Sequence, residues 1–328
     1  MYQAKHDRYQ TMKYNRCGKS GLKLSAVALG LWQNFGRDVS FTNVRQMIHT
    51  AFDHGIVHFD LANNYGGGGA EENFGRVLAD MRHYRDELCI STKAGYGMWP
   101  GPYGDRNGSR KYLISSLDQS LGRMGLEYVD IFYHHATDPD TPLEETALAL
   151  DQIVRSGKAL YVGISNYNRA QTEAILSIFR ELRVPFVVNQ PSYSMINRWV
   201  EHDGLDTFAV EQGFGLAVYS PLHQGILTDR YLNGIPADSR AGKGNEHMQD
   251  ILGREKMLPR LHALNEIAAE RGQTLSQLAL SWVLHNPAVA TVITGASNPQ
   301  QVAMNAACIE KPALSDEDMA RIEAVLNS

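Results

Sequence analysis

Short runs rich in β-branched and aromatic residues alternate with longer helical segments along nearly the whole chain, and this alternation limits the possible folds most. Seven successive strand runs start roughly every 30 residues, which is the length of one strand–helix unit. Several runs are continuously apolar, as expected for strands buried on both faces of a parallel sheet. The predicted strands are Ala26–Leu31, Val57–Leu61, Leu88–Thr92, Val129–His134, Ala159–Ile164, Phe186–Asn189, Leu216–Ser220 and Val289–Thr294. The predicted helices between them include Asn43–His54, Ala70–Met81, Ser109–Met124, Pro142–Ser156 and Arg169–Leu182.

Eight strand–helix units predict an α/β fold closed into a (β/α)8 TIM barrel, and the alternation leaves an open doubly wound sheet as the alternative. The segment Lys13–Ser25 carries two glycines between β-prone flanks and predicts an N-terminal β-hairpin. The polar, glycine-rich segment His223–Met257 shows little periodicity and predicts a long loop after strand 7, acting as a lid or ligand clamp. Residues 1–328 are expected to form one domain, because α/β barrels routinely exceed about 250 residues.

The charge balance and the cysteines narrow the class of protein. The net charge is −5 and the pI is near 6.2, so no basic field attracts nucleic acid or an anionic membrane. Cys17, Cys89 and Cys308 lie far apart in the sequence and indicate reduced thiols rather than a disulfide framework. The polar start of the chain is unlike a signal peptide, and the apolar runs are far shorter than a membrane span. We therefore expect a cytoplasmic protein.

Three familiar motifs are only approximated. Cys17–Ser20 ends like a phosphate-binding loop, but position 13 is lysine where that loop requires glycine. The run Gly66–Gly69 precedes a helix, but glutamates follow where a dinucleotide-binding turn needs small residues. No HExxH pattern is present, and His134-His135 fits the end of a strand better than a zinc site. No metal site is expected.

Four polar side chains stand at or just beyond the carboxyl ends of three consecutive predicted strands. Asp60 ends the second strand with Tyr65 a few residues beyond it, Lys93 ends the third, and His135 ends the fourth. A barrel brings these strand ends to one rim, so the four side chains are expected in one cup. There they would perturb the pKa of one another.

This grouping predicts carbonyl reduction. The Lys93 ammonium is expected to lower the pKa of Tyr65 and make the phenol a usable general acid, while Asp60 neutralises and holds Lys93. His135 is expected to donate a hydrogen bond to the carbonyl oxygen.

Each of these residues also has a plain structural interpretation. An Asp–Lys pair at a barrel rim is often only an ion pair, and a tyrosine in a glycine-rich loop is often only a loop residue. Strand alternation lets only one of His134 and His135 face the barrel. The combination on three consecutive strand ends favours the functional interpretation.

At these residues the sequence resembles the aldo-keto reductase superfamily over nearly its whole length. Phe59–Gly66 and Ser91–Lys93 look like its Asp, Tyr and Lys signatures, Gly157–Asn166 resembles its fifth strand, and Ile293–Ser297 resembles its adenosine-phosphate loop. Within the superfamily the chain is most similar to the bacterial L-glyceraldehyde-3-phosphate reductases and the potassium-channel β subunits. That closer match is carried by Leu31-Trp32, by Met98–Gly104, and by Gly225–Leu227 through Ser239-Arg240.

The resemblance implies NADPH bound in extended form over the rim, and an aldehyde beside it. The residues it implies for the cofactor are Trp32, Asp60, Ser165, Asn166, Gln190, Tyr219, Ser220, Pro221, Leu222, Gly225, Arg230, Arg240, Gly295, Ser297, Gln301 and Asn305. The residues expected around the substrate are Trp32, Tyr65, Trp99, Tyr103 and His135. Trp99, followed by Pro100, could equally be a packed loop anchor.

Three positions bear on specificity. Ala136 stands where related reductases often carry arginine, which bears on recognition of a phosphorylated substrate. Met304 replaces an acidic residue common beside the adenine-contacting asparagine, and His135 stands where channel β subunits commonly have asparagine. The expected activity is NADPH-dependent reduction of small aldehydes or ketones, with homo-oligomerisation compatible. The rival functions are an NADPH-sensing regulatory subunit and an aldolase that uses Lys93 as a Schiff base.

Overall fold

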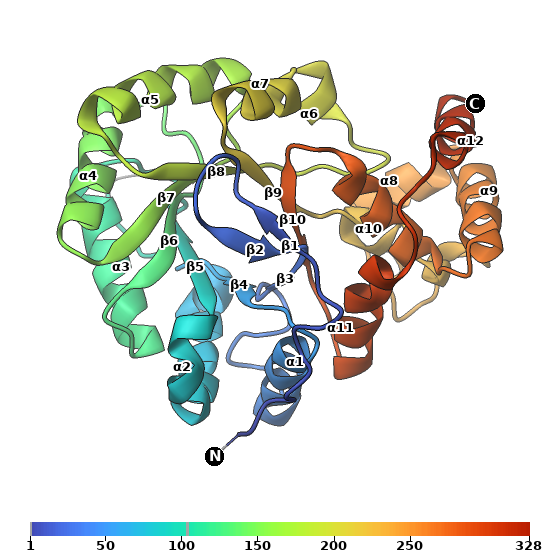
Figure 1. Cartoon of the computed structure of the whole chain (residues 1–328), viewed down its shortest axis with the longest axis horizontal. Helices are drawn as coiled ribbons and strands as arrows, with labels where there is room; N and C mark the ends of the chain where they lie inside the picture. Colours follow the sequence, from blue (N-terminus) through green and yellow to red (C-terminus); the bar gives the residue numbers. More distant parts are fainter. Residues whose placement is uncertain (1, 103–104) are drawn as a thin grey trace.

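A closed barrel of eight parallel strands forms the centre of the protein, as seen in a computed structural model that describes residues 2–102 and 105–328 (Figure 1). Its strands are β3 (Val27–Gly30), β4 (His58–Asp60), β5 (Cys89–Ala94), β6 (Val129–His134), β7 (Ala159–Ser165), β8 (Phe186–Gln190), β9 (Gly215–Tyr219) and β10 (Val289–Thr294). They pair in chain order, and β10 closes the ring against β3. The predicted barrel is confirmed and the open sheet is excluded.

The parallel register brings the ends of neighbouring strands to one level. Asp60 of β4 lies opposite Ser91 of β5, and Lys93 of β5 lies opposite Tyr133 of β6. Polar residues near the end of each strand therefore gather at one rim.

An outer ring of helices covers the strands. The first five helices are α1 (Phe41–Asp53), α2 (Gly69–Met81), α3 (Arg110–Met124), α4 (Leu143–Arg155) and α5 (Arg169–Leu182), which confirms the predicted helices to within a few residues. Side chains of Ser40, Ser109 and Asn168 cap the first turns of α1, α3 and α5 by accepting backbone hydrogen bonds. Short α6 (Trp199–His202) and α7 (Leu205–Gln212) follow β8.

The apolar core has two parts. The larger part lies between strands and helices, and the smaller part fills the barrel interior with residues such as Ala28, Ile131, Tyr133 and Val188. Gly163 of β7 makes room for the Tyr133 ring, because a Cβ at this position would lie 2.4 Å from two ring carbons. The interior is therefore a packed core and not a pore.

The predicted hairpin is present as β1 (Tyr14–Arg16) paired with β2 (Lys23–Ser25), and it covers the amino end of the barrel (Figure 1). The Lys19 amide donates to Gly213 O and the Asn15 side chain donates to Ala290 O, both near the starts of barrel strands. Leu24 is fully buried in the interior core. The hairpin closes this end of the barrel.

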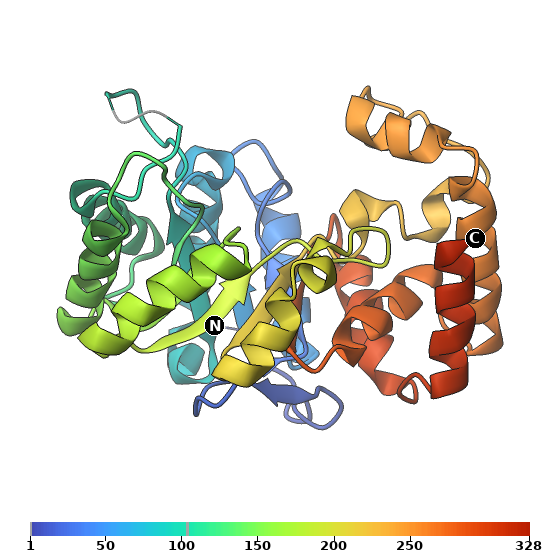
Figure 2. The same ribbon diagram turned by 90° about the horizontal axis from the view of Figure 1, so that it is seen from above.

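The segment after β9 is more ordered than predicted. The range 223–257 was expected as a loop, but it contains the 3-10 turns η3 (His223–Gly225) and η4 (Asp229–Tyr231) and the helix α8 (Glu246–Gly253). The Asn245 side chain caps α8, and Met248 and Ile251 are buried, so two apolar residues suffice to anchor this helix. Figure 2 shows α8 and the segment after β5 at the end of the barrel opposite the hairpin.

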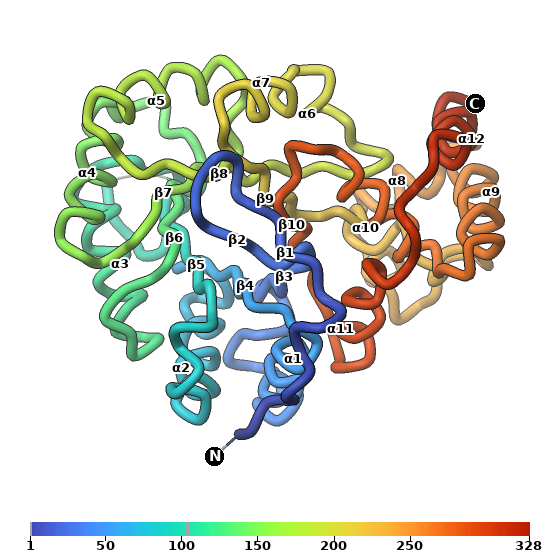
Figure 3. Tube along the Cα trace, viewed as in Figure 1, coloured from blue at the N-terminus to red at the C-terminus, as the bar shows by residue number. Residues whose placement is uncertain are grey.

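The C-terminal part comprises α9 (Met257–Glu270), α10 (Leu275–His285), α11 (Pro299–Ala306), the 3-10 turn η5 (Ala307–Glu310) and α12 (Asp316–Asn327). The N-terminus lies below α1 and the C-terminus ends α12 beside α9 (Figure 3). All three cysteines are buried and free. Among the described residues, no helix has the length and apolar character needed to cross a membrane.

Candidate active site

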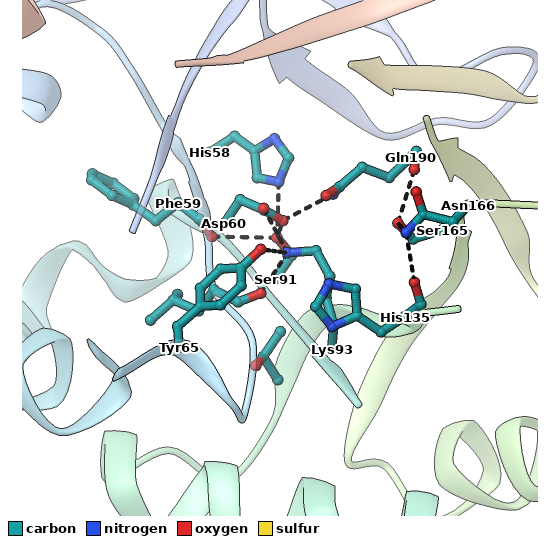
Figure 4. Close-up of polar contacts among 12 residues, drawn as sticks. His58, Phe59, Asp60, Tyr65, Ser91, Lys93, His135, Ser165, Asn166 and Gln190 are labelled. Carbon is teal, nitrogen blue, oxygen red and sulfur yellow. Dashed lines mark hydrogen bonds and ion pairs between the residues drawn. The ribbon is translucent and has the colours of Figure 1, made fainter. Parts of the chain in front are cut away.

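The four residues predicted from strand ends meet at the carboxyl rim of the barrel (Figure 4). Asp60 ends β4, Lys93 is the penultimate residue of β5, and His135 directly follows β6. Tyr65 begins a 3-10 turn, η1 (Tyr65–Gly68), that leads into α2. Its ring lies 6.0 Å from the His135 ring, edge to face.

Lys93 holds the centre of the cluster. Its side chain is fully buried, and its Nζ donates to Asp60 Oδ2 at 2.6 Å and to Leu61 O at 2.6 Å. The Tyr65 hydroxyl lies 3.4 Å from the same nitrogen. An ammonium has three protons, and these three oxygens account for all of them.

The expected direction of the Tyr65 pKa is wrong for this structure. Burial, followed by the charge of Asp60, raises the pKa of Tyr65 well above its usual value, so the net shift is upward despite the neighbouring ammonium. Burial also lowers the pKa of Lys93, and Asp60 opposes that effect. The sequence places the lysine beside the phenol but does not show how completely both groups are removed from water. At neutral pH Tyr65 carries its proton, as a general acid must.

The two histidines point to opposite sides of the strand, as alternation predicted. His134 is buried with its Nδ1 2.6 Å from the Tyr167 hydroxyl, away from the cluster. His135 faces Tyr65, and burial together with Lys93 lowers its pKa well below the usual value. Its imidazole is therefore neutral at physiological pH and has one N–H to donate.

A chain of hydrogen bonds behind Asp60 was not predicted. Ser91 Oγ donates to Asp60 Oδ1 at 2.7 Å and lies 3.0 Å from His58 Nε2, while Gln190 Nε2 reaches the same carboxylate oxygen at 3.1 Å (Figure 4). Burial lowers the pKa of His58 to about 4, so this histidine is neutral as well. The alternation of His58, Phe59 and Asp60 put His58 on the same face as Asp60, which was the available signal.

A second buried ion pair lies on the other face of β5. Glu71 is fully buried, accepts a 2.6 Å hydrogen bond from Thr92 Oγ1 and pairs with Arg123 Nε at 2.6 Å. Because Thr92 directly precedes Lys93 in β5, its hydrogen bond to Glu71 holds the strand backbone in place next to Lys93. The negative charge of Glu71 also favours the charged form of Lys93, and so opposes the effect of burial on the lysine pKa.

Tyr96 completes the wall beside His135 and was also missed. Its ring lies 4.6 Å from the His135 ring, edge to face. The residue follows β5 in the segment before the predicted Trp99, and its sequence context has no periodicity to mark it.

Four of the residues implied for the cofactor, Ser165, Asn166, Gln190 and Tyr219, are brought together at the ends of β7, β8 and β9. Tyr219 donates its hydroxyl proton to Asn166 Oδ1 at 2.8 Å, Asn166 Nδ2 donates to His135 O at 3.0 Å, and Ser165 Oγ donates to Gln190 O at 2.8 Å. Asn166 adopts a left-handed backbone with φ 61°, a conformation that asparagine tolerates. These contacts tie the Asn166 amide to the His135 end of β6.

Most of the other residues implied for the cofactor lie on two separate segments. Ser220, Pro221, Leu222 and Gly225 follow β9, while Gly295, Ser297, Gln301 and Asn305 follow β10, where Ser297 Oγ donates to Gln301 Oε1. The exposed Arg230 pairs with Asp238 at 2.7 Å, so its guanidinium already has a partner. Arg240 is half-buried and has no carboxylate within ion-pair distance among the described residues. Met304 is 40% exposed beside buried Asn305.

The aromatic residues expected around the substrate have different surroundings. Trp32 is 50% exposed and its ring lies 6.4 Å from the Tyr65 ring, so it borders the cup. Trp99 is 37% exposed and its ring lies 5.0 Å from the Tyr112 ring of α3, so its interpretations as a pocket wall and as a packed anchor both stay open. Tyr103 lies outside the described residues. Ala136 is fully buried behind His135.

A cavity outside the barrel rim is lined by none of the predicted site residues. It has a volume of about 580 Å³ and lies between α7, α10 and α12, with Val210, Trp282 and Met319 among its walls. Within residues 2–102 and 105–328, no three His, Cys, Asp or Glu side chains gather in a way that could hold a metal ion.

Comparison with known proteins places the barrel among relatives. The model of the aldo/keto reductase family matches residues 26–327. The chain is 51% identical over 326 residues to the L-glyceraldehyde 3-phosphate reductase of Escherichia coli K12, covering 98% of this chain and 94% of that protein. It is 37% identical over 324 residues to the "Probable voltage-gated potassium channel subunit beta" of Arabidopsis thaliana, with 97% of each chain covered.

Two solved structures share the fold. A glycerol dehydrogenase of Gluconobacter oxydans has a TM-score of 0.82 at 28% identity, covering 95% of this chain and 94% of that one. An aldo-keto reductase of Bacillus halodurans, solved in a holo form, has a TM-score of 0.77 at 25% identity, with 96% of each chain covered.

Proposed function

The chain belongs to the aldo/keto reductase family and is an oxidoreductase, and from that premise we propose that it reduces small aldehydes with NADPH, using Tyr65 as the proton donor. The observation that carries the proposal is the buried cluster of Asp60, Lys93, Tyr65 and His135 at the carboxyl rim. Active sites of this fold lie at that rim. The use of NADP(H) is typical of the family.

The described residues fit an NADPH molecule by their chemistry. Asn166 and Gln190 offer side-chain amides and Tyr219 offers a ring beside them, all suitable for a ring that carries a carboxamide. The half-buried Arg240 guanidinium has five donors and no carboxylate partner among the described residues, which suits a phosphate. We propose that these residues and those after β9 and β10 hold the cofactor.

NADPH, when bound, supplies the hydride that reaches the carbonyl carbon. The Tyr65 hydroxyl donates its proton to the carbonyl oxygen as negative charge develops there. The Lys93 ammonium, 3.4 Å from the Tyr65 oxygen, stabilises the phenolate that is left. Asp60 keeps Lys93 charged and in place, because a buried ammonium without a partner would deprotonate. The product is an alcohol.

His135 orients the carbonyl group in this proposal. It is neutral, it borders Tyr65, and its backbone carbonyl is tied to Asn166. A neutral imidazole N–H donates a hydrogen bond to the carbonyl oxygen without competing with Tyr65 as the acid.

The regulatory alternative is supported less well. An NADPH-sensing subunit needs the cofactor groups but has no need for a buried acid, its lysine and a neutral histidine together. The substrate class we propose is small aldehydes, with L-glyceraldehyde 3-phosphate as one candidate, since the reductase of that name is 51% identical. We also propose a single-domain, cytoplasmic enzyme, since three buried free thiols suit a reducing compartment, and self-association is compatible with it.

The test is NADPH oxidation, followed by the nicotinamide absorbance, with glyceraldehyde 3-phosphate, uncharged glyceraldehyde, methylglyoxal and 4-nitrobenzaldehyde. Turnover of any of them with NADPH supports the reductase, and NADH serves as the cofactor control. Tight NADPH binding without turnover of any aldehyde would favour the sensing subunit instead.

A further inference from the structure

An exposed arginine lies behind the aromatic wall of the proposed carbonyl site. The Arg106 guanidinium stacks over the Tyr96 ring at 4.7 Å, and the same ring touches His135 edge to face at 4.6 Å. Tyr96 thus separates a cation from the residue that faces the reacting carbonyl. Nothing in the sequence marked Arg106, which sits in a loop without periodicity.

The position of Arg106 is fixed by the backbone around it. Tyr96 and Arg106 form an isolated antiparallel bridge, flanked by hydrogen bonds from Gly97 N to Asp105 O at 3.0 Å and from Asn107 N to Gly95 O at 2.8 Å. The Tyr96 carbonyl also accepts a hydrogen bond from the Tyr112 hydroxyl of α3. The arginine therefore stands at a defined place beside the rim.

The charge of Arg106 is not neutralised within the described part of the chain. No Asp or Glu oxygen lies within ion-pair distance of its guanidinium there, whereas other arginines such as Arg123 and Arg37 are paired with glutamates. Its positive charge reaches the cup, since it contributes to lowering the pKa of His135. An exposed guanidinium without a carboxylate partner, stacked on the wall of a substrate cup, is suited to bind an anion.

We propose that Arg106 is the anion-recognition group of this site, so that the preferred substrates are short aldehydes carrying a phosphate or carboxylate a few bonds from the carbonyl. This inference rests on the proposed reductase function and deepens it. Ala136 is small and buried, so the position next to His135 offers no cation, and Arg106 supplies one from the segment between β5 and α3. The Tyr96 ring spaces the anion from the carbonyl held at His135.

The experiment compares an anionic and a neutral substrate of the same carbon skeleton. We expect the wild-type protein to show a higher kcat/KM for glyceraldehyde 3-phosphate than for glyceraldehyde. In Arg106→Gln, kcat/KM for the phosphorylated substrate should fall about 10-fold through KM, as for a lost hydrogen bond to a charged group at an exposed site, and glyceraldehyde should change less than about 2-fold. Arg106→Lys should keep part of the preference.

The matched control is Arg110→Gln, which removes the same charge four residues away. The Arg110 guanidinium bonds to Leu148 O of α4, and this variant should leave the ratio of the two substrates unchanged. Inorganic phosphate, tested as a competitive inhibitor against 4-nitrobenzaldehyde at saturating NADPH, should inhibit wild type more strongly than Arg106→Gln.

The outcomes separate the two proposals. Equal losses on both substrates in Arg106→Gln, or a wild-type preference for the uncharged aldehyde, would overturn the role of Arg106 while leaving the reductase intact. Absence of turnover of every aldehyde tested with the wild type, methylglyoxal and 4-nitrobenzaldehyde included, would remove the proposed function itself.

Discussion

The carboxyl end of the barrel buries charge, whereas the amino end buries apolar side chains under a hairpin. At the carboxyl end, Lys93 and Asp60 are at most 2% exposed and depend on each other for neutralisation. At the amino end, Leu24 and Cys17 are fully buried and pack into the apolar barrel interior. A buried ion pair adds little net stability, but a buried leucine adds a good deal. One end therefore serves chemistry and the other serves stability.

The strongest test of this division is Tyr65→Phe at the carboxyl end. Loss of the acid should lower kcat about 10²- to 10⁴-fold. The urea midpoint and NADPH binding, followed by tryptophan fluorescence, should stay near wild type, because the ring remains and the hydroxyl has only a long contact to Lys93. Tyr96→Phe removes a hydroxyl from the same cup and serves as the control, with a much smaller loss expected. Wild-type turnover in Tyr65→Phe would exclude Tyr65 as the acid.

Lys93→Met should lower both the activity and the stability of the protein. The Asp60 carboxylate would stay buried without its cation, which costs about 3–5 kcal/mol of unfolding free energy, and turnover should be lost. Ser91 and Gln190 still donate to that carboxylate, so the loss should lie toward the lower figure. Urea unfolding measures it. The double variant Asp60→Asn/Lys93→Met should recover stability but no activity. Recovery of activity would contradict the proposed roles of Asp60 and Lys93 in the reaction.

Leu24→Ala at the amino end should show the reverse pattern. Truncating a fully buried leucine should cost about 2–5 kcal/mol of unfolding free energy, while kcat at a temperature where the protein remains folded stays unchanged. Thermal unfolding and NADPH oxidation on the same sample would measure both. A drop in kcat as large as the one expected for Tyr65→Phe would show that the two ends are not independent.

A further comparison of the two ends concerns pH. Burial lowers the pKa of His58, His134 and His223 to about 4, from 6.5 in the unfolded chain. Between pH 6.5 and 4 the unfolded chain binds more protons at these histidines than the folded chain does. The free energy of unfolding is therefore highest above pH 6.5 and decreases as the pH falls. Hydrogen exchange, corrected for its intrinsic pH dependence, should show residues 58–65 and 134–136 loosening at pH 5 before residues 14–25.

A variant sharpens the pH comparison. His58→Leu removes one of the imidazoles whose pKa is lowered by burial and should flatten part of the fall in stability, although it also removes the 3.0 Å contact to Ser91. A pH dependence identical to that of wild type would show that His58 takes no part in it.

The sequence predicts the barrel and the meeting of Asp60, Lys93, Tyr65 and His135 because both follow from periodicity. Strands and helices repeat, and strand ends converge once the ring closes. Helix α8 was missed because only two buried residues anchor it. Tyr96 and Arg106 could not be found this way, since their pairing depends on one isolated bridge between two irregular segments. The raised pKa of Tyr65 depends on complete burial, which a linear pattern does not show.

The burial of the three thiols affects how readily electrophilic aldehydes can modify the protein. Aldehydes and dicarbonyls are electrophiles, and the thiolate is the nucleophilic form of cysteine. Burial raises the pKa of Cys17 and Cys308 to about 12 and that of Cys89 well above its usual value, so almost no thiolate exists at neutral pH. Molecules that the cup attracts thus meet no reactive sulfur on the protein. Under the proposed function, the burial of the three thiols removes cysteine as a target of electrophilic substrates.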